Sequence, residues 1–541
     1  MANEFVARKG LAIATSSVSV GTENKVLVLG NDNVVRYRTD YQVTSNALVP
    51  AGPTYAIQIS SGSGLTGYGL IDSLNGNLSF NKSSYSITMT GSRNTFFGIY
   101  SGQNNTSGSF NTFIGNNSGY SNDVGSCNTF IGDQSGQSNT TGCFNTYLGL
   151  CSGYSNIIGN YNTFIGQESG KGSTQSGYNT FLGFRTGFSN ISGCANVFLG
   201  HQSGYYNVSG CFNSFIGHQS GYCNTIGFEN TYIGFNSGYY NTTGCQNTFI
   251  GHQAGYSTTQ SCANTFIGHR AGFSNTIGNY NTFIGYGSGI NNTTGNTNTF
   301  IGYGSGNSST QSCANTFMGH TTGYNNSTGC FNSYYGHTSG FSNTTGCFNT
   351  YMGLGSGYSN ISGCQNTFIG YNSGRSATQS LYNTFLGNNA GYSTTGNINV
   401  FLGNNAGYCN NIGTCNIYIG LNSGYNATQS SSNIFIGNNS GFNNRGCQNT
   451  FLGNNAGCDN QTGTNNTFIG YNAGSATGSF SNSIVIGAGA QASSNNEFVL
   501  GSSTSPILTS TFSGMVIQYM VIKLNDVYWK IPLHEMVLGS V

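Results

Sequence analysis

The sequence predicts an all-β protein, a parallel β-solenoid, from three observations. A motif of the form Asn-Thr-Phe-Ile-Gly returns every 17 residues from Asn94 through Asn383. Glycine recurs inside every repeat, which disfavours helices. Short β-branched and aromatic runs stand between Gly and Asn, as is typical of strands joined by turns. One repeat is therefore one coil, and about 23 coils of 17 residues stack about 4.7–4.9 Å apart.

Within one coil we number the motif asparagine as position 0. Position +2 is Phe or Tyr, +3 is mostly Ile or Leu, and Gly98, Gly102 and Gly108 stand at +4, +8 and +14 of the first coil. The glycines are expected to supply corners with positive φ. The recurring asparagines are expected to form a ladder of side-chain amides that caps the turns.

The apolar pair at +2 and +3 predicts self-association. Successive side chains of a strand point to opposite faces, so one of the pair fills the coil interior and the other points away from it. Repeated over all coils, the outward residue forms an apolar stripe larger than the few hundred Å² that a monomer usually exposes. Association along the stripe with closed cyclic symmetry would cover it.

The composition excludes several classes of partner. Of 541 residues only 5% are charged and the net charge is +1, which gives no electrostatic basis for binding nucleic acid or an anionic membrane. No apolar run reaches the ~18–20 residues of a membrane span, so no membrane insertion is expected. Aromatic residues make up 13% of the chain, which argues for an ordered structure. No cofactor is predicted.

Position +9 is aromatic in most coils. An aromatic ladder on a solenoid surface could stack on the sugar rings of a glycan, or the rings could stack only on one another and seal a corner. The candidate ligand-binding residues are Tyr120, Tyr154, Tyr205, Tyr222, Tyr239 and Tyr256.

Six histidines occupy position +5. If this position faced the axis of a trimer, two stacked coils would offer six imidazoles, an octahedral metal site. The same position also holds Phe184, Tyr286 and Leu354, which favours an outward-facing column and no metal. The candidate metal ligands are His201, His218, His252, His269, His320 and His337.

Ten of the 16 cysteines stand at −2, including Cys313, Cys330, Cys347 and Cys364 on successive coils. Their parallel Cβ directions suit a disulfide poorly, and the CxxC spacing of zinc sites is absent, so we expect small buried thiols. Few carboxylates and no Ser-His-Asp pattern accompany the repeat. The sequence therefore predicts a protein that is not an enzyme.

The repeat changes to a spacing of 14 near its end, in SNSIVIGAGAQASSNNEFVLG at 481–501. This segment resembles the head repeats of YadA-like trimeric autotransporter adhesins. The resemblance implies a left-handed parallel β-roll, three copies of which pack as a homotrimer. The 17-residue array resembles an expanded form of the same coil and is similar to arrays in fibre-like proteins of phages.

The chain departs from that family in two expected features, an export signal and a C-terminal membrane anchor, neither of which we recognise in it. The sequence therefore predicts a structural virion fibre, a tail fibre or spike, that mediates host attachment. Its expected partners are a baseplate or fibre-base protein and a cell-surface glycan or protein receptor. A bacterial surface adhesin or extracellular filament subunit is the first alternative, and an ice-binding solenoid, suggested by the threonines at +1, is a remote one.

Four regions are predicted: an N-terminal β attachment region at 1–93, the 17-residue-repeat shaft at 94–481, YadA-like head repeats at 482–505, and a C-terminal β-hairpin cap or tip at 506–541. The hairpin would turn at Asn525-Asp526. If it is a receptor-binding tip, Tyr528 and Trp529 are its candidate contact residues.

Overall fold

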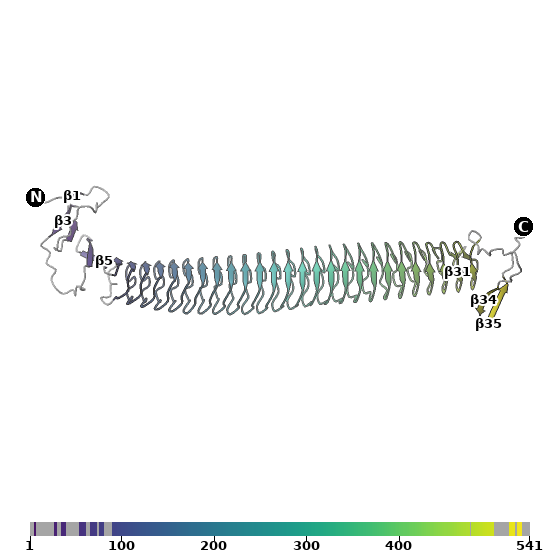
Figure 1. Cartoon of the computed structure of the whole chain (residues 1–541), viewed down its shortest axis with the longest axis horizontal. Coiled ribbons are helices and arrows are strands. Elements are labelled where there is room, and N and C mark those ends of the chain that lie inside the picture. The colour runs from purple at the N-terminus through teal and green to yellow at the C-terminus, as the bar shows by residue number, and fades with distance from the viewer. Residues whose placement is uncertain are drawn as a thin grey trace. The chain divides into compact units, whose positions relative to one another are not determined.

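The computed structural model describes residues 75–80, 89–474 and 478–502 with most of their side chains, and beyond them the backbone of several strands. The chain divides into two compact units, Met1–Ser261 and Cys262–Val541. Both units contain the predicted parallel β-solenoid, which has about 24 turns of ~17 residues in total (Figure 1). The described residues form strands and turns and no helix.

Each regular coil contributes one strand of three residues. The first unit contains β7 (Thr95–Phe97), β8 (Thr112–Ile114), β9 (Thr129–Ile131), β10 (Thr146–Leu148), β11 (Thr163–Ile165), β12 (Thr180–Leu182), β13 (Val197–Leu199), β14 (Ser214–Ile216), β15 (Thr231–Ile233) and β16 (Thr248–Ile250). The second unit contains β17 (Thr265–Ile267), β18 (Thr282–Ile284), β19 (Thr299–Ile301), β20 (Thr316–Met318), β21 (Ser333–Tyr335), β22 (Thr350–Met352), β23 (Thr367–Ile369), β24 (Thr384–Leu386), β25 (Val400–Leu402), β26 (Ile417–Ile419), β27 (Ile434–Ile436), β28 (Thr450–Leu452) and β29 (Thr467–Ile469).

Neighbouring strands within each unit pair in parallel and in register. Tyr147 of β10 lies opposite Phe164 of β11, and Leu148 lies opposite Ile165. Each side chain therefore has the residue at the same position of the next coil as its neighbour. The register continues past the 17-residue array, where β31 (Ile484–Ile486) pairs in parallel with both β29 and β33 (Phe498–Leu500), while the short strands β30 (Gly474–Ser475) and β32 (Gln491–Ala492) form a second parallel pair.

The aromatic residue at +2 forms the core of the solenoid. Phe113 and Phe130 are fully buried, and their rings stack with centroids 4.8 Å apart and planes 7° apart. The residue at +3 faces outward, as Leu148 at 43% exposed shows. The prediction that +2 and +3 face opposite sides of the strand is confirmed.

The motif asparagines form the predicted amide ladder inside the coil. The backbone N–H of Asn128 donates to Oδ1 of Asn111 (2.9 Å), and its Nδ2 donates to the carbonyl of Gly142 (2.7 Å). Both asparagines are fully buried. The ladder thus satisfies buried backbone groups that no strand pairing reaches.

A second buried asparagine ladder runs along +11, which the sequence reasoning missed. Nδ2 of Asn122 donates to Oδ1 of Asn105 (2.7 Å) on the preceding coil and to the carbonyl of Gly125 (3.0 Å) on its own coil. Gly125 is required here because a Cβ would lie 2.4 Å from Asn122 Oδ1. The glycine at +14 therefore serves close approach and not positive φ.

The corners use positive φ at more positions than the glycines predict. Gly98 and Gly102 adopt φ of 135° and 61°, as expected. Residues that are not glycine also adopt φ near 55° at −1 and +6 of most coils, for example Phe110 (60°) and Asn117 (54°). This conformation costs about 1–2 kcal/mol for an L-residue. It persists because the neighbouring coil binds the strained peptide, as when the N–H of Phe110 donates to the carbonyl of Ser92 (2.8 Å).

Further strands flank the solenoid at either end of the chain. In the N-terminal part β3 (Val34–Arg38) pairs antiparallel with β1 (Phe5–Val6) and β2 (Val26–Leu29), and β5 (Leu65–Asp72) pairs antiparallel with β4 (Thr54–Ser60) and β6 (Asn77–Phe80). In the C-terminal part β34 (Tyr519–Leu524) pairs antiparallel with β35 (Val527–Pro532). The predicted turn at Asn525-Asp526 lies outside the described residues, and the four predicted region boundaries remain predictions.

Two glycines of one coil provide a test of the core packing. Gly287 and Gly289 have φ of 61° and 57°, but a Cβ on Gly287 meets nothing within 4 Å, whereas one on Gly289 lies 2.6 Å from Cδ2 of Phe283. We expect Gly287→Ala to cost about 1 kcal/mol of backbone strain, and Gly289→Ala about 2–4 kcal/mol because it also overpacks the ring stack. Hydrogen exchange of peptides covering 281–297 measures the opening free energy, and equal losses in the two variants would contradict this packing.

Candidate interaction surfaces

The outward residues of each strand, at +1 and +3, form a continuous surface that we call the strand face. At +3, Leu182 and Leu199 on neighbouring coils are 42% and 39% exposed. Across the described 17-residue coils neither position holds a charged residue. In the first unit ten coils stack about 4.8 Å apart, so the strand face extends about 43 Å along that unit. The residues at +3 of this face form a contiguous apolar column, which differs from the single exposed apolar residues scattered on most protein surfaces.

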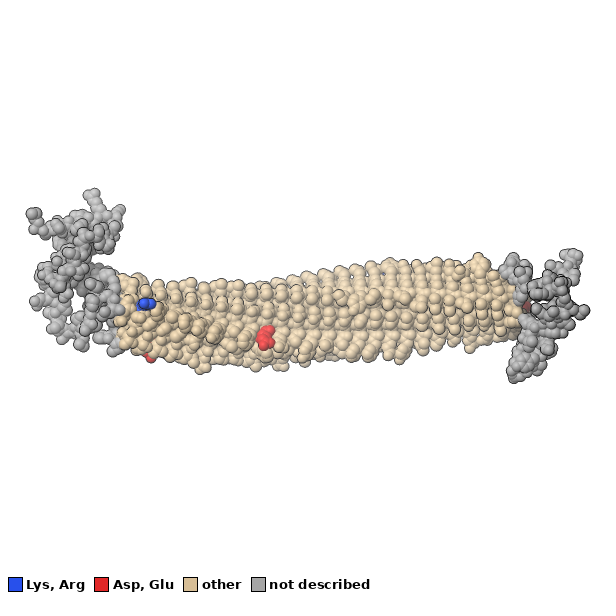
Figure 2. Space-filling view, in the orientation of Figure 1, with Lys and Arg blue, Asp and Glu red and all other residues tan. Residues whose placement is uncertain are grey.

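Several coils also expose apolar side chains outside the strand face. At −1, Phe144, Tyr161 and Tyr178 are 49–67% exposed and stack on one another with centroids 4.9 and 5.0 Å apart. Charged side chains are sparse on the side of the molecule that Figure 2 shows. A surface of this composition is typical of a protein that contacts other protein along much of its length.

The predicted aromatic ladder at +9 exists, but not all six candidates belong to it. Tyr205, Tyr222, Tyr239 and Tyr256 stack in sequence with centroids 5.0–5.3 Å apart and are half-buried. Burial and neighbouring tyrosines raise the pKa of Tyr222 to about 12. These rings cover one another's faces, and Tyr206 and Tyr240 meet them in edge-on contacts with centroids 4.7–5.2 Å apart.

Two of the candidates, Tyr120 and Tyr154, stand apart from this ladder. Position +9 of the coils on either side of them holds Gln103, Gln137 or Lys171. Tyr120 meets Tyr100 edge-on, with centroids 6.4 Å apart. The stacking explanation therefore fits four of the six residues, and glycan binding by any of them remains a prediction.

The histidines at +5 lie in stacked columns at the surface. His201 stacks on His218 with centroids 4.8 Å apart, and His320 stacks likewise on His337 at 4.8 Å. All four are exposed, His252 is exposed and His269 is half-buried. Within the described residues no group of three or more His, Cys, Asp or Glu side chains is placed to hold a metal ion. The exposure of this column agrees with the outward orientation inferred for +5, and the expectation of no bound metal remains a prediction.

The prediction that the cysteines are buried is wrong. None of the 16 is buried, and all are free thiols. At −2 the thiol accepts a hydrogen bond from the backbone of the preceding coil: the N–H of Cys313 donates to Sγ of Cys330 (3.2 Å). Ser109 fills the same role with its hydroxyl, which accepts from the N–H of Ser92 (3.0 Å). The column holds small acceptor side chains at the edge of the coil, a polar role that burial statistics for cysteine do not predict.

A charged cluster that the sequence reasoning missed lies on adjacent coils of the first unit. Glu168 and Arg185 both stand at +6, with Arg185 Nε 2.5 Å from the Glu168 carboxylate, and Lys171 Nζ lies 2.7 Å from the same carboxylate. Hydrogen bonding from Lys171 lowers the pKa of Glu168. The guanidinium also lies 5.0 Å from the ring centroid of Phe184. The sequence feature that could have predicted this cluster is the pair of opposite charges, Glu168 and Arg185, which stand one repeat apart.

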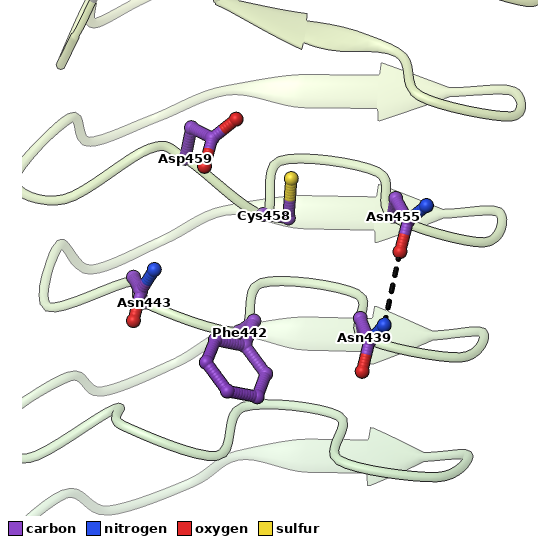
Figure 3. A pocket seen from close by; sticks show the side chains of 6 residues that line it. All are labelled: Asn439, Phe442, Asn443, Asn455, Cys458 and Asp459. Atoms are coloured by element: carbon purple, nitrogen blue, oxygen red, sulfur yellow. Dashed lines mark hydrogen bonds between the residues drawn. The ribbon is translucent and has the colours of Figure 1, made fainter.

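A shallow groove of about 310 Å³ opens where an aromatic run at +9 ends. Tyr408, Tyr425 and Phe442 stack on successive coils with centroids 4.9 and 5.1 Å apart, but the next coil carries Cys458. Burial and the charge of Asp459 raise the pKa of Cys458 to about 11, so this thiol is neutral at physiological pH. Figure 3 shows the six lining residues, Asn439, Phe442, Asn443, Asn455, Cys458 and Asp459.

The candidate tip residues, Tyr528 and Trp529, lie on β35 opposite Lys523 and Ile522 of β34. Their side chains are outside the described part, so their role as a tip remains a prediction. The described part of the chain contains no helix with the length and apolar character needed to span a bilayer. Comparison of the chain with protein-family models and with curated proteins found no match.

The cysteine column yields a test by alkylation. Burial and a hydrogen bond with the Cys313 thiol raise the pKa of Cys330 to about 11, against the opposite effect of the Cys313 backbone N–H. The thiolate is the reactive form, so in the folded protein its alkylation by iodoacetamide should be slow at pH 8 and rise with a midpoint near pH 11. The same peptide alkylated in denaturant, where thiols titrate near about 8.5, is the control. Coincident pH profiles of the folded and denatured protein would contradict the environment described for Cys330.

Proposed function

We propose that this chain forms the shaft of a non-enzymatic virion fibre, a tail fibre or spike, that assembles as a homotrimer and attaches a particle to a host surface. The observation that carries the proposal is the strand face, a charge-free surface on which partly exposed residues at +3, mostly Ile and Leu, form a column beside the residues at +1, mostly Thr. Packing three such faces around a common axis would remove the column from water. The resemblance of 481–501 to trimeric adhesin heads supports the same assembly.

The free energies of burial and of association favour contact along many coils. A leucine that is about 40% exposed returns roughly 0.5–1 kcal/mol when its remaining surface is covered. Association costs an estimated 4–15 kcal/mol in lost translational and rotational freedom. A single coil is therefore far too little, whereas ten or more coils together reach the cost. This dependence on length is consistent with a long, uniform array.

A passive role in spacing and attachment agrees with the surface chemistry. Among the described residues charges are scattered, and the one cluster with several charges, at Glu168, is internally neutralised by Lys171 and Arg185. In this proposal one end of the chain binds a baseplate or fibre-base protein, and the fibre also binds a cell-surface receptor, a glycan or a protein. A bacterial surface adhesin or filament subunit with the same trimeric shaft is the second candidate.

Native mass tests the homotrimer. We expect light scattering to give three times 56.9 kDa, about 171 kDa. The double change Leu182→Lys with Leu199→Lys places charges on two neighbouring coils of the strand face while the other coils keep their apolar contacts, so the trimer should form but dissociate at a higher protein concentration than the unaltered trimer. Ile226→Lys, at a 54%-exposed position away from the strand, is the matched control and should leave the mass unchanged. A monomeric unaltered chain would contradict the proposal.

Genomic context and particle composition test the virion assignment separately. We expect capsid and tail genes beside the gene for this chain, and its peptides in purified particles analysed by mass spectrometry. Secretion genes as neighbours, with the protein recovered from a bacterial surface, would favour the adhesin. Because a trimeric shaft serves either role, this outcome leaves the mass measurement unaffected.

A further inference from the structure

One arginine of this chain shows how a +9 column can hold a guanidinium. Arg375 stands at +9 of its coil, where most coils carry an aromatic ring. Its guanidinium lies 4.9 Å from the ring centroid of Tyr358, the +9 residue of the preceding coil. Its Nη1 donates a 2.8 Å hydrogen bond to Oδ1 of Asn372, the +6 residue of its own coil. The guanidinium thus has a ring on one side and an amide oxygen at its edge.

The groove beside Phe442 has the same parts without the arginine. Phe442 takes the place of Tyr358, Asn455 at +6 takes the place of Asn372, and Cys458 stands at +9. The Phe442 ring stacks on Tyr425 of the preceding coil. The next coil carries Cys458 in place of a further ring (Figure 3). Where a guanidinium would fill the space, the chain has a small, neutral thiol.

The groove adds a negative charge that the Arg375 arrangement lacks. Asp459 stands at +10, where the coil of Arg375 has Ser376. Its carboxylate is exposed and lies at the groove. Oδ1 of Asn455 accepts one hydrogen bond, from Nδ2 of Asn439 (3.1 Å), which leaves its second lone pair for another donor. An aromatic face, an amide oxygen and a carboxylate together match a planar cation that donates several hydrogen bonds.

We propose that this groove binds an arginine side chain of a partner polypeptide, with its guanidinium stacked on Phe442 and hydrogen-bonded to Asn455 and Asp459. Arginine fits better than lysine because a planar guanidinium can lie on the ring and donate to both oxygens at once. The chain uses the same contact within itself, since the guanidinium of Arg270 lies 4.8 Å from the ring centroid of Phe273 and that of Arg185 lies 5.0 Å from the ring centroid of Phe184. The proposal does not depend on trimer assembly or on a virion location.

The test uses the full chain and two small probes, N-acetyl-arginine amide and its neutral isostere N-acetyl-citrulline amide. Saturation-transfer difference NMR detects weak ligands of large proteins. We expect the arginine probe to bind with a Kd on the order of 1 mM, which is reasonable for one cation–π contact with two hydrogen bonds, and the citrulline probe about ten-fold more weakly.

Three variants locate the site. Cys458→Arg should fill the groove as Arg375 fills its own position, and abolish binding. Phe442→Leu and Asp459→Asn should each weaken it about three- to ten-fold. Asp133→Asn, which removes a surface carboxylate elsewhere, is the matched control and should change nothing. If Cys458→Arg does not fold, as circular dichroism would show, the other two variants carry the test.

Several results would overturn the proposal. Equal binding of both probes would show that charge is not recognised, and full binding by Asp459→Asn and Phe442→Leu would place the site elsewhere. Binding of methyl glycosides in preference to the arginine probe, lost in Phe442→Leu, would make the groove a sugar site. No detectable binding at 20-fold the expected Kd would leave it without an arginine-binding function.

Discussion

The in-register stack of coils, about 4.8 Å apart, is the constraint on which the rest of the structure depends. It makes each side chain the neighbour of the residue at the same position in the next coil, so a column persists only when its residues attract their own kind. Phenyl rings do so by offset stacking, with centroids 4.7–4.9 Å apart in most of the core pairs. The amide of asparagine does so because it carries both a donor and an acceptor.

Charged side chains repel their own kind when they occupy the same position in adjacent coils, which explains a composition with only 5% charged residues. Two like charges one coil apart destabilise the pairing, as directly opposed like charges do in any sheet. Opposite charges can share a column: Glu168 and Arg185 occupy the same position on adjacent coils and form an ion pair. The uncharged strand face is thus first a consequence of stacking, and its apolar +3 residues are the additional feature that bears on assembly.

The sequence was informative about periodicity and less so about orientation. Period 17 and the parallel register followed from the repeat, and alternation along a strand predicted that +2 and +3 face opposite sides. That +2 is the buried position, as at Tyr147, and +3 the outward one, as at Leu148, came from the structure. The ladder at Asn122 and the positive φ at Phe110 were not predicted either, because they depend on corner geometry that a repeat length leaves open. The cysteines were misplaced for a related reason: a small residue type suggested burial, whereas Cys330 lies at the edge and accepts a backbone hydrogen bond.

The candidate surfaces are of two kinds, contacts that repeat in every coil and positions where one coil differs from its neighbours. A contact repeated in every coil, such as Leu182 or Leu199 on the strand face, contributes little alone and gains its effect by multiplication, which suits assembly along a shaft. Recognition of one partner group requires a position that differs from its neighbours. Such positions arise where a column breaks, as where Cys458 replaces the ring expected after Phe442. In a chain this uniform, the substitutions that interrupt a ladder, and not the ladder itself, are where binding specificity is to be sought.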